Sequence, residues 1–184
     1  MRVRTILFVK VENNIYESLC IYGTPPQSFP WGYNEADPAC IKLKETINNT
    51  ILKLIAMGYK NFFSGMALGV DTWAAEAVLN LRDTNPTLKL HCILPCATQP
   101  QNWPEAAQKR YFSIVRRADF IFYVSKEYHK NCMQERNHFM VENASLLLAV
   151  YNGQQRTGTG ATVNYARKLG RQIIIINPIS LNYN

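Results

Sequence analysis

The sequence has 184 residues, of which 47% are hydrophobic and 18% are charged. This length is typical of one domain with a full core, and the composition excludes disordered, collagen-like and disulfide-scaffold proteins. With 20 Lys and Arg against 13 Asp and Glu, the formal net charge is +7, which suits a phosphate-bearing partner and equally suits plain solubility.

No apolar run approaches the roughly 20 residues of a membrane span, and Lys10 interrupts the apolar stretch near the start. We therefore expect a cytoplasmic protein without a membrane partner. The five cysteines form no CxxC pair and resemble buried free thiols. His91 and Cys92 would point to opposite faces of a strand, so we expect no metal and no cofactor.

Six short apolar runs, bounded by Gly, Pro or Asn, have the composition of buried strands. They cover residues 18–23, 61–65, 89–95, 119–125, 145–151 and 172–178. Residues 1–17 do not fit this pattern cleanly, because the segment RTILFVKV is either an extra edge strand or part of an N-terminal extension.

Stretches with helical periodicity separate these strands. They cover residues 41–55, 72–81, 104–117, 133–143 and 162–169. Gly58 should end the first helix and Gly170 should cap the last. Apolar strands separated by helices predict an α/β fold, with a Rossmann-like doubly wound, mostly parallel sheet and helices on both faces. A single domain should cover residues 18–184.

In such a sheet, ligands bind beyond the carboxyl ends of the strands. The second strand-to-helix junction reads SGMALGVD, where Gly65 and Gly69 allow close backbone approach and the first N–H groups of the next helix attract anions. Asp71 would repel a phosphate, so we expect it to cap the helix or to accept a hydrogen bond from a ribose hydroxyl. An ordinary tight turn is the alternative.

The last junction, NGQQRTGTGATVN, is a second candidate for anion binding. Gly158 and Gly160 accompany the hydroxyls of Thr157, Thr159 and Thr162 just before a predicted helix. The junction lacks the GKS or GKT ending of a P-loop, and neither junction carries GxGxxG where a dinucleotide fold needs it.

Other stretches offer side chains that could face a ligand. Trp31 and Tyr33 could stack on a base or simply pack, and Arg136 is either a phosphate clamp or an exposed residue. A loop and the start of a helix supply Gln99, Trp103, Lys109, Arg110 and Tyr111. No nucleophile triad is visible.

Four blocks together resemble the YpsA-like branch of the SLOG superfamily, which includes the DNA-processing protein DprA and the LOG phosphoribohydrolases. These blocks are SGMALGVDTWAAE, PC followed by Gln99 and Trp103, ERNHFMV, and the Gly/Thr-rich junction. The resemblance runs from about Ser18 to Pro178. It implies a Rossmann-like fold that binds nucleotides or their derivatives, in stand-alone proteins or in sensors of bacterial and phage conflict systems. It also implies a homo-oligomer.

The sequence departs from the family pattern in three places, one of which is the last loop, where the usual GGT reads Thr157, Gly158 and Thr159 and one glycine is lost. The CxTGHRP block of relatives reads CIYGTPPQ here, so Thr24 and Pro25 replace His and Arg and one cationic contact is missing. LOG enzymes carry a glutamate after the last glycine-rich loop, whereas residues 161–164 include no carboxylate. Asp71 and Glu76 remain as possible substitutes.

We therefore expect binding of a nucleotide or nucleotide-derived small molecule, as a sensor, carrier or sequestering protein, rather than an enzyme. A LOG-type N-glycosidase or phosphoribohydrolase and DprA-like DNA binding are the alternatives, although the basic residues are scattered. The expected ligand-binding residues combine the junctions with the resemblance. They are Gly23, Thr24, Gly65, Met66, Ala67, Gly69, Asp71, Gln99, Trp103, Arg136, Gly158, Thr159, Gly160 and Thr162.

Overall fold

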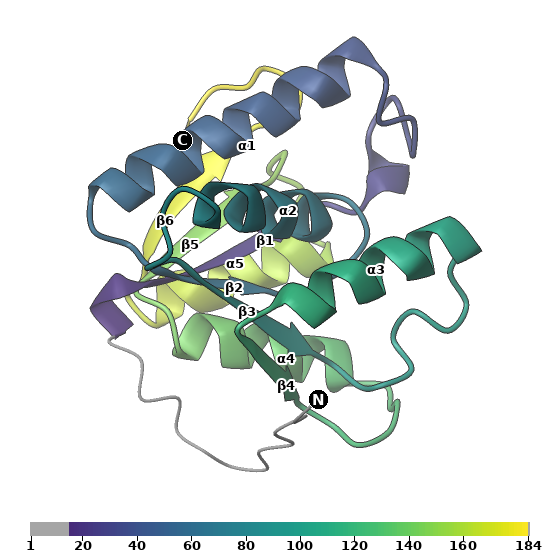
Figure 1. The fold of residues 1–184 in the computed structure, drawn as a ribbon. Coiled ribbons are helices and arrows are strands. Elements are labelled where there is room, and N and C mark those ends of the chain that lie inside the picture. The colour runs from purple at the N-terminus through teal and green to yellow at the C-terminus, as the bar shows by residue number, and fades with distance from the viewer. Residues whose placement is uncertain (1–14, 184) are drawn as a thin grey trace.

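Six strands form the central sheet of the computed structural model, which describes residues 15–183 (Figure 1). They are β1 (Ser18–Gly23), β2 (Asn61–Ser64), β3 (Lys89–Leu94), β4 (Phe120–Tyr123), β5 (Leu146–Val150) and β6 (Gln172–Ile176). Their spatial order is β4-β3-β2-β1-β5-β6, and all neighbouring pairs are parallel. The predicted α/β sheet is confirmed.

Helices cover both faces of this sheet (Figure 1). One face carries α1 (Pro38–Ala56), α2 (Val70–Arg82) and α3 (Glu105–Arg117), and the other carries α4 (Cys132–Glu142) and α5 (Gly158–Lys168). The chain first winds from β1 to β4 and then returns to place β5 on the other side of β1. The topological switch point, where such sheets bind ligands, therefore lies between β1 and β5.

Short 3₁₀ turns lie on either side of β1, at η1 (Ile15–Glu17) and η2 (Pro26–Ser28). The segment RTILFVKV, considered above as an edge strand, lies outside the described residues. No helix within the described part of the chain combines the length and apolar character that crossing a membrane requires.

The ends of α1 follow from its sequence, although its start differs from the prediction. Gly58 follows the helix with a φ of +98°, as expected of a helix stop. The helix begins at Pro38 rather than at residue 41, because the side chain of Asp37 accepts a hydrogen bond from the Ala39 amide (2.8 Å). The apolar periodicity that begins at Ile41 did not include the first three residues of the helix, Pro38, Ala39 and Cys40.

The predicted start of α5 was wrong by four residues. Gly158 and Gly160 were expected in a loop, but they lie in the first turn of the helix, which Thr157 caps by accepting a hydrogen bond from the Gly160 amide (3.0 Å). A Cβ on Gly160 would approach the Gln155 carbonyl oxygen to 2.6 Å, so tight packing selects glycine despite its low helix propensity. Gly170 follows the helix with a φ of +65°, as predicted.

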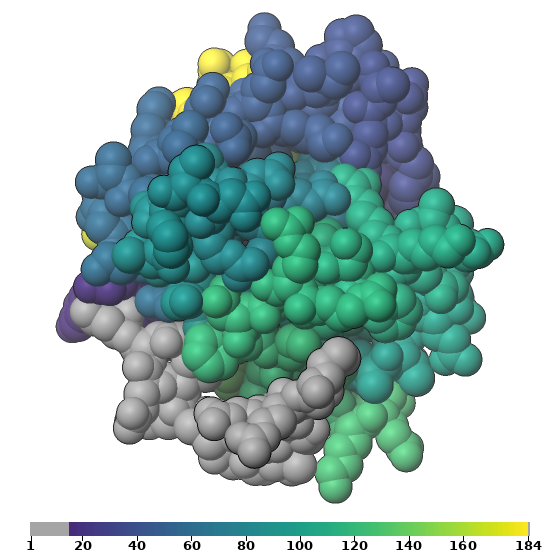
Figure 2. All heavy atoms as spheres, in the orientation of Figure 1, coloured from purple at the N-terminus to yellow at the C-terminus, as the bar shows by residue number. Residues whose placement is uncertain are grey.

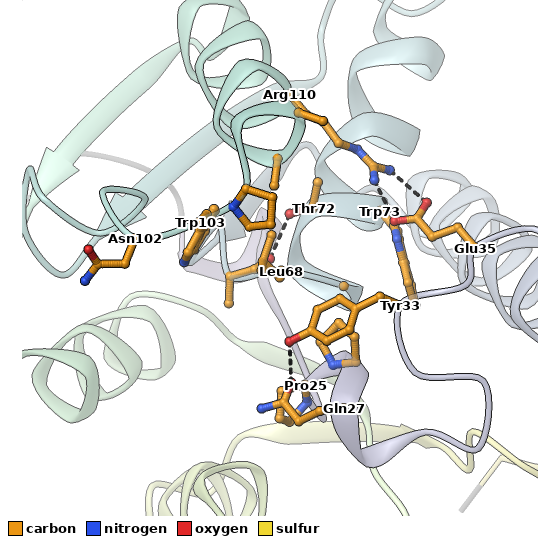
Figure 3. Close-up of a pocket in the computed structure, with 16 residues that line it drawn as sticks. Pro25, Gln27, Tyr33, Glu35, Leu68, Thr72, Trp73, Asn102, Trp103 and Arg110 are labelled. Atoms are coloured by element: carbon orange, nitrogen blue, oxygen red, sulfur yellow. Dashed lines mark hydrogen bonds and ion pairs between the residues drawn. The ribbon is translucent and has the colours of Figure 1, made fainter.

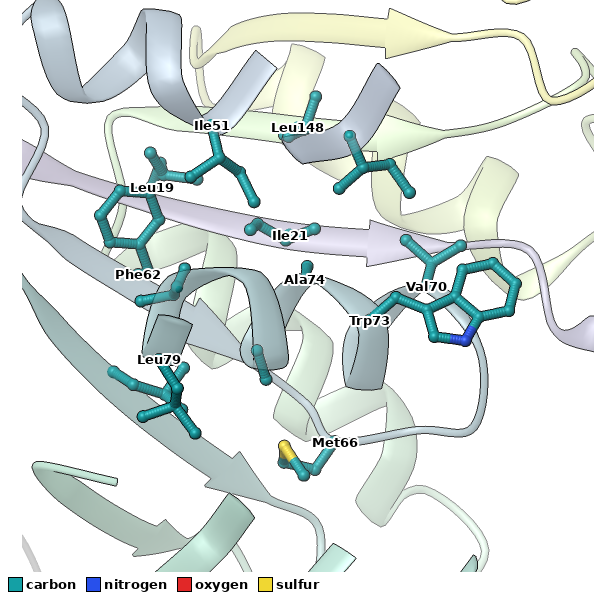
Figure 4. Close-up of a cluster of buried hydrophobic side chains, with 14 of the residues drawn as sticks. Leu19, Ile21, Ile51, Phe62, Met66, Val70, Trp73, Ala74, Leu79 and Leu148 are labelled. Carbon is teal, nitrogen blue, oxygen red and sulfur yellow. The ribbon is translucent and has the colours of Figure 1, made fainter. Parts of the chain in front are cut away.

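The largest hydrophobic cluster lies between the sheet and the layer of α1 and α2 (Figure 4). Ile21 of β1 and Leu148 of β5 contribute to it from the sheet, and Ile51 and Leu79 contribute from the helices. All four side chains are almost fully buried. Because this cluster fixes α2 on the sheet, it also fixes the loop between β2 and α2, where the candidate site lies.

Candidate functional site

A pocket of about 740 Å³ opens among the loops that follow the first three strands (Figure 3). Its walls come from residues 25–35 after β1, residues 67–73 after β2 and residues 102–110 after β3. In the space-filling view, the segment before α1 and the helix α3 meet on this face of the molecule (Figure 2). The volume is in the range of small-molecule sites.

Aromatic and proline side chains form two facing parts of the wall. Trp103 lies on one side of the opening, and Tyr33 and Pro25 lie across from it (Figure 3). Pro104 also lines the pocket. The Trp103 ring packs edge-on against Tyr111, with 5.5 Å between the ring centroids. The pocket therefore offers flat apolar surfaces on which a planar ring can lie.

The floor is the loop that starts α2. Ala67, Leu68 and Gly69 line the pocket, and Gly69 precedes the helix with a φ of +88°. A Cβ on Gly69 would lie 2.7 Å from Pro26 Cγ, so the close approach of these two loops requires glycine. The first N–H groups of α2 have no acceptor within the helix and carry the positive end of its dipole.

A buried ion pair lies beneath this loop. The Arg136 side chain is 3% exposed and that of Asp71 is 2% exposed, with 3.5 Å between Arg136 Nη1 and Asp71 Oδ2. The Ala67 amide donates a hydrogen bond to the same Asp71 oxygen (3.4 Å). On its other side the guanidinium lies over the Tyr22 ring, 5.8 Å from its centroid. A Cβ on Gly65 would overlap it.

This arrangement corrects two expectations. Asp71 does not cap α2, because Gly69 is the N-cap and the Asp71 carboxylate is turned into the protein. Burial raises the pKa of Asp71 to about 6, although Arg136 and neighbouring backbone N–H groups act in the opposite direction. The alternative of an exposed Arg136 is also wrong. Among the described residues, its Nε and Nη1 atoms have no hydrogen-bond acceptor.

Gln99 and Met66 shape the same loop from below rather than lining the pocket. The Gln99 side-chain amide donates a hydrogen bond to the Gly65 carbonyl oxygen (3.0 Å). The Met66 side chain is fully buried, and the Met66 backbone has a φ of +54°. The Ser64 hydroxyl accepts a hydrogen bond from the Met66 amide (3.1 Å) and donates to the Asp71 carbonyl oxygen (2.9 Å). These bonds leave the loop little freedom.

The remaining predicted residues lie beside the ends of β1 and β5 and not on the pocket wall. Thr24 donates its hydroxyl to the Val150 carbonyl oxygen (3.1 Å). In the first turns of α5, Thr162 donates to the Gly158 carbonyl oxygen (3.0 Å) and accepts a hydrogen bond from Asn137 (3.2 Å). Thr159 and Gly160 are buried in that turn, and Gly23 packs against Val70. Of the fourteen predicted residues, Ala67, Gly69 and Trp103 line the pocket.

Sequence reasoning missed one charged residue of the wall, Glu35. The Arg110 guanidinium donates to both oxygens of Glu35 (2.6 and 3.2 Å) and to both oxygens of Glu76 (2.6 Å each). Lys44 also donates to Glu35 (2.6 Å). These cations hold the pKa of Glu35 at about 2, against the effect of burial. The four residues come from four separate segments, so no local spacing could have revealed the cluster.

Comparison with known proteins identifies related sequences. The model of the YspA SLOG family (YpsA) matches residues 19–180. A UPF0398 protein of Halalkalibacterium halodurans is 31% identical over 147 residues, which cover 77% of this chain and 78% of the relative. The UPF0398 protein YpsA of Bacillus subtilis is 25% identical over 142 residues, which cover 76% of this chain and 79% of that protein.

A similar fold is present in the solved structure of DNA processing protein A from Helicobacter pylori, which is described for its single-stranded DNA binding mode. The TM-score is 0.58 at 17% identity, and the similarity covers 87% of this chain and 65% of that chain. At this level of identity the likeness establishes a shared fold.

Substituting Gly65 tests the packing of the buried arginine against the loop. We expect Gly65→Ala to lower the free energy of unfolding by about 1–3 kcal/mol, because its methyl group and the Arg136 guanidinium would occupy the same space. Gly158→Ala is the matched control, since a Cβ there meets only the Tyr22 hydroxyl, at 3.4 Å. Urea unfolding measures both variants, and equal stabilities would contradict the packing described here.

The buried Asp71 predicts a pH dependence of stability. Its pKa of about 6 lies above the ordinary value of 3.8, so between these values the folded chain binds more protons than the unfolded chain. The contribution of Asp71 to stability should therefore fall as pH rises from about 4 to about 6. Chemical unfolding of wild type and Asp71→Asn across this range should show wild type losing stability relative to the variant. Parallel profiles would exclude the raised pKa.

Proposed function

This chain belongs to the YspA SLOG family, and from that premise we propose that it binds a nucleotide or nucleotide-derived small molecule in the pocket at the start of α2. One observation carries the proposal. The pocket joins the aromatic faces of Trp103 and Tyr33 to the glycine-containing loop that starts a helix. A nucleotide presents the complementary pair of groups, a planar base and an anionic phosphate.

The base of the ligand lies against Trp103 in this proposal. Stacking of a base on an aromatic side chain contributes about 1–3 kcal/mol and tolerates different bases. Tyr111 of α3 packs edge-on against the Trp103 ring, so the ring face needs little ordering when the ligand binds.

The ribose or phosphate lies at Leu68 and Gly69, next to the first N–H groups of α2, which have no acceptor within the helix. The negative charge of Asp71 does not oppose this placement, because its carboxylate is buried and lies beside Arg136. The predicted ligand contacts of Arg136 and of Gly158, Thr159, Gly160 and Thr162 stay predictions. Such contacts require a ligand that extends toward the switch point between β1 and β5.

The carboxylates near the pocket favour capture over cleavage. Cleavage of a glycosidic bond needs a carboxyl group that donates a proton or attacks the sugar. Arg110 occupies both oxygens of Glu76 and, together with Lys44, both oxygens of Glu35, so neither carboxylate is free to attack a sugar. Glu35 is also held ionised and has no proton to donate. Asp71 lies off the pocket wall. We therefore propose a sensor, carrier or sequestering protein that works in the cytoplasm, with a homo-oligomer as its expected state.

Mass spectrometry of small molecules released by heat from the purified protein tests this proposal. We expect a nucleotide-derived molecule at about one per chain. Accumulation of free base and ribose phosphate after adding that molecule back would instead identify an enzyme. If nothing is released and no nucleotide in a panel shifts the melting temperature, the proposal is wrong.

A variant of Trp103 tests the place of the ligand. Trp103→Leu keeps an apolar side chain but removes the ring face, and we expect it to weaken binding of the identified molecule by about tenfold or more. Phe112→Leu on the exposed side of α3 is the matched control, because Phe112 does not line the pocket. Calorimetric titration measures both, and equal affinities for Trp103→Leu and wild type would move the ligand away from this wall.

A further inference from the structure

The pocket has almost no free positive charge. Among the described residues of its wall, Glu35 and Arg110 are the charged ones. Arg110 makes four hydrogen bonds to Glu35 and Glu76, and a guanidinium has five N–H groups. Arg110 can therefore donate one further hydrogen bond to a ligand.

The surrounding charges also cancel. Glu35 receives a hydrogen bond from Lys44 in addition to those from Arg110. The cluster thus contains two cations, Arg110 and Lys44, and two carboxylates, Glu35 and Glu76. Because the pKa of Glu35 is about 2, its carboxylate stays ionised at neutral pH and the cancellation persists there.

A neutral wall suits some nucleotides better than others. Proteins usually bind chains of phosphates with Arg, Lys or a metal ion, which compensate the several negative charges. The positive end of a helix corresponds to about half of a unit charge. The start of α2 can therefore offset part of the charge of one phosphate, while each further phosphate would add charge that the wall does not compensate.

Building on the proposed function, we infer that the pocket prefers nucleosides and nucleoside monophosphates over di- and triphosphates, and that Glu35 sets this preference. Glu35 keeps Arg110 occupied at the pocket wall, where Figure 3 shows the guanidinium reaching toward it. Removing the Glu35 charge would leave Arg110 and Lys44 opposite Glu76 alone, with a local net charge of +1 and free N–H groups on Arg110.

Calorimetric titration of wild type at fixed ionic strength tests the preference. The probes are adenosine, AMP, ADP and ATP, with the matching guanosine series. We expect AMP or GMP to bind more tightly than the matching diphosphate, and about tenfold more tightly than the triphosphate. Equal affinities for the three, or affinity that rises with added phosphates, would overturn this inference and leave the proposed function standing.

Glu35→Gln tests the residue that sets the preference. We expect the variant to shift the affinity ratio of ADP to AMP toward ADP by about tenfold. Glu142→Gln carries the same charge change at the far end of α4, on the other face of the sheet, and should leave the ratio unchanged. An unchanged ratio in Glu35→Gln, with AMP binding retained, would overturn the role of Glu35.

Two outcomes of these titrations also bear on the proposed function. If neither series binds wild type at millimolar concentration, this inference fails. The proposed function fails as well only if the purified protein also releases no nucleotide-derived molecule and no nucleotide in the panel shifts its melting temperature. Tight binding of a single-stranded oligonucleotide, with steep salt dependence and without binding of mononucleotides, would overturn both in favour of a nucleic-acid site. The wild-type titrations decide the preference by themselves, so the test does not depend on the variant folding.

Discussion

The structure of the site depends on one buried cation. The Arg136 guanidinium lies beneath the loop between β2 and α2, over the Tyr22 ring and 3.5 Å from an Asp71 oxygen. Gly65 must be glycine because the guanidinium occupies the space where a Cβ would be. The loop therefore has one available path over Arg136, and this path brings Leu68 and the start of α2 to the pocket floor.

The molecule thus separates two groups of charges. Arg136 and Asp71 form the buried group, which shapes the loop, and burial raises the pKa of Asp71 to about 6. Glu35 and Arg110 belong to the second group, which ties the segment before α1 to α3 at the pocket wall. Neither group leaves a free cation on the wall. In this account a ligand binds through ring stacking and backbone N–H groups, so its recognition depends on the shape of the loops.

The sequence predicted the sheet well because every strand is a short apolar run that ends at a polar residue or a turn. It also identified Ala67, Gly69 and Trp103, which lie in motifs at strand ends. It could not reveal that Arg136 is buried under Gly65 or that Glu35 meets Arg110, because those contacts join residues 71 and 75 positions apart. The start of α5 was missed because local helix propensity disfavours glycine, whereas the packing around Gly160 requires it.

Where the ligand binds can be tested directly by following the backbone amide and indole N–H resonances by NMR while AMP is added. A nucleotide in the pocket should give saturable shifts for residues 67–72 and for the Trp103 indole, which lie on or beside the pocket wall. Shifts confined to residues 158–162, at the start of α5, would place the ligand on the other side of β1. That result would contradict the assignment of the pocket.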